Sequence, residues 1–137
     1  MNNLTEIVET LMIEVNKEHL SLLEYAINLG ADIRVRGPKR KTLHIFFNDK
    51  TYGYINNTIL SKGCVLGYYF NPFDHPYPHA PDDIKTNPLR SLCDRYKATV
   101  NNFNVHVGTG SNSGRVFVGI VDLSIAKRVI ETDTAHL

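Results

Sequence analysis

The chain has 137 residues, of which 42% are hydrophobic and 21% are charged, and its net charge is +1. That length and composition are typical of one ordinary globular domain, and the small net charge excludes a global field that would draw the chain onto nucleic acid or a membrane. No apolar run approaches the roughly 20 residues that span a bilayer, and Cys64 and Cys93 lack the spacing of a zinc site. We therefore expect a single cytoplasmic domain over residues 1–137, with reduced thiols and no membrane contact.

Apolar residues at helical spacing predict a mostly helical segment over residues 4–29. Asn3 and Glu6 have the spacing of a capping box at its start. Gly30 is a natural left-handed stop at its end. Asn16 can divide the segment into two helices, one face of which we expect to pack on a sheet.

Four short strands with tight turns are predicted next. They are expected over residues 32–36, 42–47, 51–55 and 64–70. Short strands with short connections favour an antiparallel meander. In the third strand, strict alternation places Tyr52 and Tyr54 on the same face of the sheet.

Four prolines within residues 71–83 exclude a helix or a central strand there, so this stretch is expected to be an extended surface loop. Pro88 then begins a helix that reaches about residue 99. Two strands follow, over residues 103–108 and 116–121. The second is apolar on both faces, which predicts a position inside the sheet.

Ser124 is expected to cap a short C-terminal helix, and the polar residues after it to fray. The predicted fold is therefore a single α+β domain. It has an antiparallel sheet of five to six strands, with an N-terminal helix, a central helix over about 88–99 and a short C-terminal helix packed on it.

Basic residues gather on the first hairpin of the predicted meander. A local cluster of cations can contact phosphates, but the same charges also protect an edge strand from aggregation. The cluster consists of Arg34, Arg36, Lys39, Arg40 and Lys41.

A second candidate is the glycine- and serine-containing segment 108–115 between the last two strands. Its glycines allow successive amides to point at one anion, with Thr109, Ser111 and Arg115 as further contacts. Gly119, inside the following strand, suggests the close approach of another group. A mobile hairpin loop is the simpler interpretation.

The proline-rich stretch has two alternative interpretations. Phe73 and Tyr77, held among prolines, offer a surface of low conformational entropy for a protein partner. His75, His79 and Asp82 are suitable ligands for a transition metal, although no helical motif orders them.

His106-Val107-Gly108-Thr109 and His44-Ile45-Phe46-Phe47 resemble the paired histidine motifs of the 2H phosphoesterases. The resemblance implies phosphodiester hydrolysis with His44 and His106 as the acid–base pair. The family places Ser or Thr two residues after each histidine, whereas this chain has Phe46 and Gly108. That departure removes half of the expected phosphate contacts.

These observations favour a non-catalytic binding protein without a cofactor, such as a phage-type inhibitor or sequestering protein. It would contact a phosphate-bearing ligand, nucleotide or nucleic acid, or a protein partner. A hydrolase or nuclease that uses histidine or a metal is one alternative. An oligomeric assembly subunit that buries tyrosines 52, 54, 68 or 69 is another.

Overall fold

The computed structural model describes residues 4, 7, 15–36, 42–70, 88–107 and 116–135. At positions 36, 50, 58, 68–70, 88, 91, 107 and 116 it describes the backbone alone. The elements, in chain order, are α2 (Lys17–Asn28), β1 (Asp32–Arg36), β2 (Thr42–Phe47), β3 (Lys50–Ile55), α3 (Asn57–Ser61), β4 (Leu66–Phe70), α4 (Pro88–Tyr96), the 3-10 turn η2 (Val100–Asn102), β5 (Phe103–Val107), β6 (Val116–Ile120) and α5 (Leu123–Thr134).

The six strands form one antiparallel sheet in the order β1-β2-β3-β4-β6-β5. The α+β fold class is confirmed, and so is the meander of the first four strands. β6 lies between β4 and β5, and Phe117, Val118 and Ile120 are all buried. Its continuous apolar run therefore has the predicted cause, which is cover on both faces inside the sheet.

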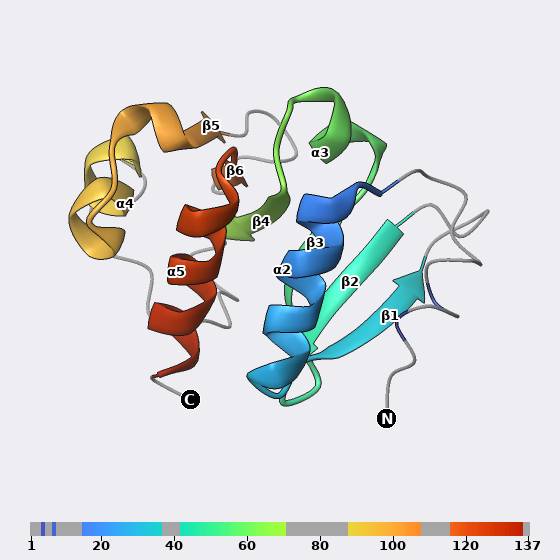
Figure 1. The fold of residues 1–137 in the computed structure, drawn as a ribbon. Coiled ribbons are helices and arrows are strands. Elements are labelled where there is room, and N and C mark those ends of the chain that lie inside the picture. Colours follow the sequence, from blue (N-terminus) through green and yellow to red (C-terminus); the bar gives the residue numbers. More distant parts are fainter. Residues whose placement is uncertain are drawn as a thin grey trace.

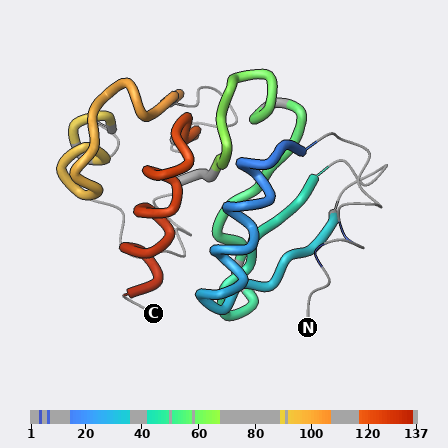
Figure 2. The backbone as a smooth tube through the Cα atoms, viewed as in Figure 1, coloured from blue at the N-terminus to red at the C-terminus, as the bar shows by residue number. Residues whose placement is uncertain are grey.

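Helices α2 and α5 lie side by side over one face of the sheet (Figure 1). They come from opposite ends of the chain, as the blue and red colours in Figure 2 show. Their apolar stripes bury Leu22, Leu23, Val129 and Ile130 completely against the strands. At about 25 cal/mol per Å² of apolar surface, this shared core is the main source of stability.

Helix α2 begins where the sequence suggests that the N-terminal helical segment divides. The Asn16 side chain accepts a hydrogen bond from the backbone N–H of His19 at 3.0 Å, which caps the first turn. Gly30 then ends the helix with φ of +104°, a conformation that a side chain would strain. Leu4 and Ile7 are helical, whereas the capping box expected at Asn3 and Glu6 lies outside the described residues.

The other face of the sheet carries a short helix that the sequence did not reveal. Helix α3 places Ile59 directly over Gly67, where an added Cβ would collide with its Cδ1. A Cβ at Gly119 would lie 2.7 Å from Cys64 Sγ. The close approach expected at Gly119 is therefore real, but the approaching group is the protein's own thiol.

The prediction that Tyr52 and Tyr54 share a face is wrong. The pairing of β2 with β3 shifts register between Ile45 and Phe46, so that Gly53 faces Ile45 and Thr51 faces Phe46. Tyr52 is the extra residue of this β-bulge, which interrupts the alternation of the strand. Tyr52 consequently joins the core beneath the helices, whereas Tyr54 packs on the opposite face.

Two expectations for the C-terminal helix also need correction. The N-cap of α5 is Asp122, whose carboxylate accepts a hydrogen bond from Ser124 N–H at 2.8 Å, so Ser124 is not the cap. The helix is also longer than expected, and Asp133 in its last turn is buried instead of frayed.

Two smaller differences from the sequence-based expectations concern the ends of strands. β4 begins at Leu66 instead of residue 64, and β6 ends at Ile120 instead of residue 121.

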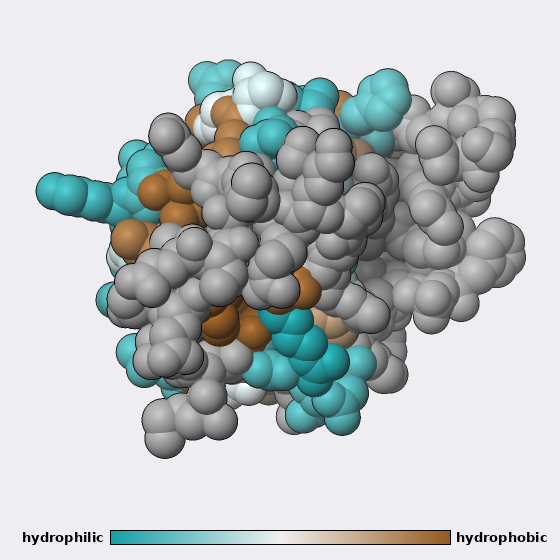
Figure 3. Space-filling model, turned by 90° about the vertical axis from the view of Figure 1, so that its right-hand side faces the viewer, coloured by the Kyte–Doolittle hydropathy of each residue, from teal (hydrophilic) through white to brown (hydrophobic). Residues whose placement is uncertain are grey.

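Hydrophobic and hydrophilic side chains of the described residues are interspersed on the side of the molecule that Figure 3 shows. Within the described ranges, no helix is both long and apolar enough to cross a membrane.

Candidate functional site

Arg34 is the one cation of the predicted basic cluster whose side chain is described, and other residues already engage it. Its Nε lies 2.6 Å from Asp32 Oδ2 and its Nη2 lies 3.0 Å from Asp49 Oδ1. These hydrogen bonds, first to Asp32 and then to Asp49, raise the pKa of Arg34. Its guanidinium also stacks 4.3 Å from the centre of the Phe46 ring. A phosphate would have to compete with two carboxylates for this side chain.

Of the rest of that cluster, the structure describes only the backbone of Arg36. Strand β1 is an edge strand, and its last residue, Arg36, pairs with Thr42. Lys39, Arg40 and Lys41 lie outside the described residues, within the short connection between these two positions. Charged residues on or next to an edge strand have a sufficient reason in solubility alone.

Arg115 lies outside the described residues, but the strand that follows it is placed. Arg115 directly precedes Val116, the first residue of β6, and β6 lies four strands from β1. With about 4.8 Å between strands and about 3.3 Å per residue, the backbones of Arg36 and Val116 are roughly 25 Å apart. Lys39, Arg40, Lys41, Thr109, Ser111 and Arg115 lie outside the described residues, so the predicted ligand set that joins them to Arg34 and Arg36 stays a prediction.

The strand residues that flank the segments 71–87 and 108–115 are neighbours in the sheet. Phe70 ends β4 and pairs with Val116, and Val116 pairs on its other side with Val107, the end of β5. We call this three-residue row the loop end of the sheet. Phe73, Tyr77, Thr109, Ser111 and Arg115 lie outside the described residues, but both of their segments start from neighbouring strands at this end.

His44 and His106 lie on the same face of the sheet but far apart. His44 pairs with Tyr54, whereas His106 pairs with Phe117 on the edge strand β5. β2 and β5 are separated by three strands, which puts the two histidines about 20 Å apart. They cannot act as acid and base on one phosphodiester, so the hydrolase that the two motifs imply lacks its central geometry.

The alternative metal ligands cannot be placed. His75, His79 and Asp82 all lie between Phe70 and Pro88, outside the described residues. Within the part of the chain that the structure does describe, no group of three His, Cys, Asp or Glu side chains is arranged to hold a metal ion.

The buried carboxylate of Asp133 lies at the centre of a cluster of polar side chains. Asp133 is 1% exposed, and it accepts hydrogen bonds from Tyr52 Oη at 2.5 Å and from Tyr96 Oη at 2.9 Å. Arg95 Nη2 lies 3.4 Å from the same carboxylate. Burial raises the pKa of Asp133, and the two tyrosines and Arg95 oppose that rise. The cluster joins α5 to β3 and α4.

This cluster was missed in the sequence, although helical spacing contains a signal for it. Asp133 follows Val129 and Ile130 at four and three residues, which continues the buried stripe of α5. Its partner Tyr52 is buried as well, so Tyr52 has no surface to offer an assembly interface.

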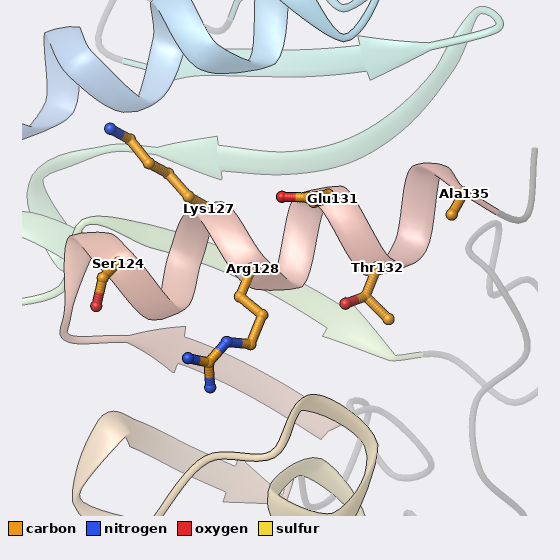
Figure 4. A pocket seen from close by; sticks show the side chains of 6 residues that line it. All are labelled: Ser124, Lys127, Arg128, Glu131, Thr132 and Ala135. Carbon is orange, nitrogen blue, oxygen red and sulfur yellow. The ribbon is translucent and has the colours of Figure 1, made fainter.

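A shallow hollow of about 520 Å³ runs along the outer side of α5. Figure 4 shows that its two cations point to opposite sides of the helix. Lys127 Nζ lies 5.6 Å from the Tyr25 ring of α2, whereas Arg128 Nη1 donates to the carbonyl oxygen of Lys97 at 2.7 Å. Because the charges diverge and Arg128 holds the end of α4, the hollow does not concentrate positive charge on one ligand.

Comparison with known proteins adds no family to this description. No model of a protein family matches the chain. No curated protein sequence and no solved structure matches it either.

Proposed function

We propose that this protein acts by non-catalytic, stoichiometric contact with a protein partner, through the segments 71–87 and 108–115. The observation that carries the proposal is the pairing of Phe70 with Val116 and of Val116 with Val107. Two segments with no expected secondary structure, 17 and 8 residues long by their bounds, thereby start from adjacent strands at one end of a rigid sheet. Surface loops positioned by a scaffold are a common site of binding.

The residue types in these segments suit a protein partner better than a free phosphate. Phe73 and Tyr77 supply large apolar contacts, and the neighbouring prolines reduce the entropy lost on binding. The first segment contains three aspartates and one lysine, so it repels rather than attracts a polyanion. Arg115 alone adds positive charge from the second segment. An aromatic centre with a polar rim is the usual anatomy of a protein interface.

The partner is sought with a photo-crosslinking amino acid placed at Tyr77. The matched control carries the same group at Glu24, which is exposed midway along α2. We expect a discrete covalent adduct after irradiation in the native cell from position 77 and none from position 24. Mass spectrometry of the adduct then identifies the partner, which is purified for binding measurements.

Binding of that partner is measured by calorimetry for two variants. Phe73→Ala with Tyr77→Ala is expected to weaken binding about 30-fold or more, the effect of losing about 2 kcal/mol at an interface hot spot. Lys39→Ala with Lys41→Ala, at the opposite corner, should change it less than about threefold.

The opposite pattern would refute the proposal in favour of phosphate binding. In that case position 77 gives no adduct, and the chain binds oligonucleotides with an affinity that falls steeply with salt. Substituting Lys39, Arg40 and Lys41 by alanine would then reduce the slope of log K against log salt by about 0.9 for each phosphate that these side chains neutralise on duplex DNA.

A further inference from the structure

The two edges of the sheet differ in how they are protected against pairing with another strand. Along β1, Asp32 and Arg34 form an ion pair at 2.6 Å, and Arg36 adds a further charge at the end of the strand. Such charges discourage strand addition. Strand β5, Phe103–Val107, contains no lysine, arginine, acidic residue or proline. It is the unprotected edge among the described strands.

One backbone hydrogen bond at the start of β5 shows which residues of this strand bond to β6 and which point their backbone groups outward. Val121 N–H donates to Asn102 C=O at 3.0 Å, and the register continues from Phe103 opposite Ile120. Because bonded and non-bonded pairs alternate in an antiparallel ladder, Asn104 and His106 bond to β6. The backbone groups of Phe103, Val105 and Val107 therefore point away from the sheet.

Exposed apolar side chains gather at the same corner. Val100, the first residue of the η2 turn that leads into β5, is 55% exposed, and Val121, directly after β6, is 41% exposed. Only one other large apolar side chain, Leu29, is classed as exposed among the described residues. A partner that extends the sheet at β5 would also reduce the exposure of this corner.

We propose that β5 pairs antiparallel with β5 of a second copy of this chain, about a two-fold axis through Val105. In this register the Val105 residues face each other, and Phe103 faces Val107 of the second copy. Asn104 faces His106 of the second copy on the other side of the sheet. The strand is thus self-complementary, with apolar opposite apolar and amide opposite imidazole, as an isologous interface requires.

Neighbouring registers are poorer for identifiable reasons. The outward backbone groups allow two-fold centres at positions 104, 105 or 106. A centre at 106 would set His106 against His106 of the second copy instead of against Asn104, and it would leave Phe103 unpaired within the strand. A centre at 104 pairs fewer outward groups within Phe103–Val107. The centre at Val105 uses the whole strand. The two Val105 residues exchange two backbone hydrogen bonds, and the Val107 N–H of each copy donates one more to the Phe103 C=O of the other copy. Phe103 N–H already donates to Val100 C=O.

A matched pair of double variants tests the register. Asn104→Lys with His106→Lys places lysine opposite lysine at both cross-strand positions. Asn104→Lys with His106→Glu places lysine opposite glutamate at the same positions. Sedimentation equilibrium over a range of protein concentrations should show a dimer for the natural chain and for the Lys/Glu variant. The Lys/Lys variant should dissociate at least tenfold more readily at low salt, and the difference should shrink at 0.5 M salt, an ionic strength chosen to screen surface charges.

Cysteine pairing gives a second, independent readout of the same axis. On mild oxidation, a chain carrying Asn104→Cys should cross-link to a chain carrying His106→Cys, and neither variant should cross-link to itself through the new cysteine. Mass spectrometry of the linked peptides identifies the pair. Circular dichroism checks that each variant is folded. A monomer at all concentrations, or a dimer equally tolerant of both charge variants, would overturn the proposal without bearing on the loop-end partner.

Discussion

Replacing Asp133 by alanine should be among the most damaging single substitutions in this chain. The change removes a buried carboxylate that two tyrosine hydroxyls and Arg95 contact from α4 and β3. Arg95 is itself largely buried, with a side chain only 19% exposed. Losing one member of a buried charge pair leaves the other charge without compensation.

The expected loss of unfolding free energy is about 3–5 kcal/mol, which is the usual cost of breaking a buried ion pair from one side. A domain of this size has roughly 5–15 kcal/mol in total, so the variant should be marginally stable. Tyr52→Phe removes one hydrogen bond to a charged group and should cost less, about 1.5–3 kcal/mol.

Urea unfolding followed by far-ultraviolet circular dichroism measures these losses. With a slope of about 2 kcal/mol per molar, the midpoint for Asp133→Ala should fall by roughly 2 M. The control is Glu131→Ala on the exposed side of the same helix, which loses only the 2.6 Å hydrogen bond from Tyr25 and should cost less than about 1 kcal/mol. Equal midpoints for the two variants would refute a stabilising role for the buried cluster.

Three further predictions concern pH, close packing and helix capping. Because burial raises the pKa of Asp133 above 3.8, the folded chain holds this proton more tightly than the unfolded chain, so the contribution of Asp133 to stability rises as pH falls from the folded pKa toward 3.8. Urea midpoints at pH 7 and pH 4 should show this rise in the natural chain and not in Asp133→Asn. Gly119→Ala should cost about 1–3 kcal/mol because its Cβ would meet Cys64 Sγ, and Cys64→Ala should recover part of that loss in the double variant, as measured by urea unfolding. Asp122→Ala removes the cap of α5 and should lower the thermal midpoint by the equivalent of about 1 kcal/mol.

The sequence predicted the elements whose signals are local. Clean alternation in Asp32–Arg36, followed by turn residues and the strand-like run Thr42–Phe47, is enough to define β1, β2 and their antiparallel pairing. Proline at the first position of α4 and glycine after α2 mark helix ends by their own backbone preferences. In each case the residues that determine the element lie within the element itself or within a few residues of its ends.

Features that depend on distant partners could not be obtained in that way. The bulge at Tyr52 arises from the pairing of β3 with β2, so alternation within β3 alone gave the wrong face. Asp133 looked like a fraying polar residue because its partners, Tyr52 and Tyr96, are 81 and 37 residues away. The separation of His44 from His106 follows from the strand order, which neither motif contains.

The insertion of β6 between β4 and β5 has the largest functional consequence, because it decides which segments are neighbours. It sets Val107 and Val116, which bound residues 108–115, in one row with Phe70, which precedes residues 71–87, and it leaves β5 as an edge. The longer segment is anchored at both sides, since Phe70 is paired within the sheet and Pro88 begins a helix that Tyr96 and Arg95 tie to Asp133. Anchored ends reduce the conformational freedom that a segment loses when it binds. The buried carboxylate therefore bears on binding by holding α4 in place, and Asp133→Asn should weaken capture of a loop-end partner even where the chain remains folded.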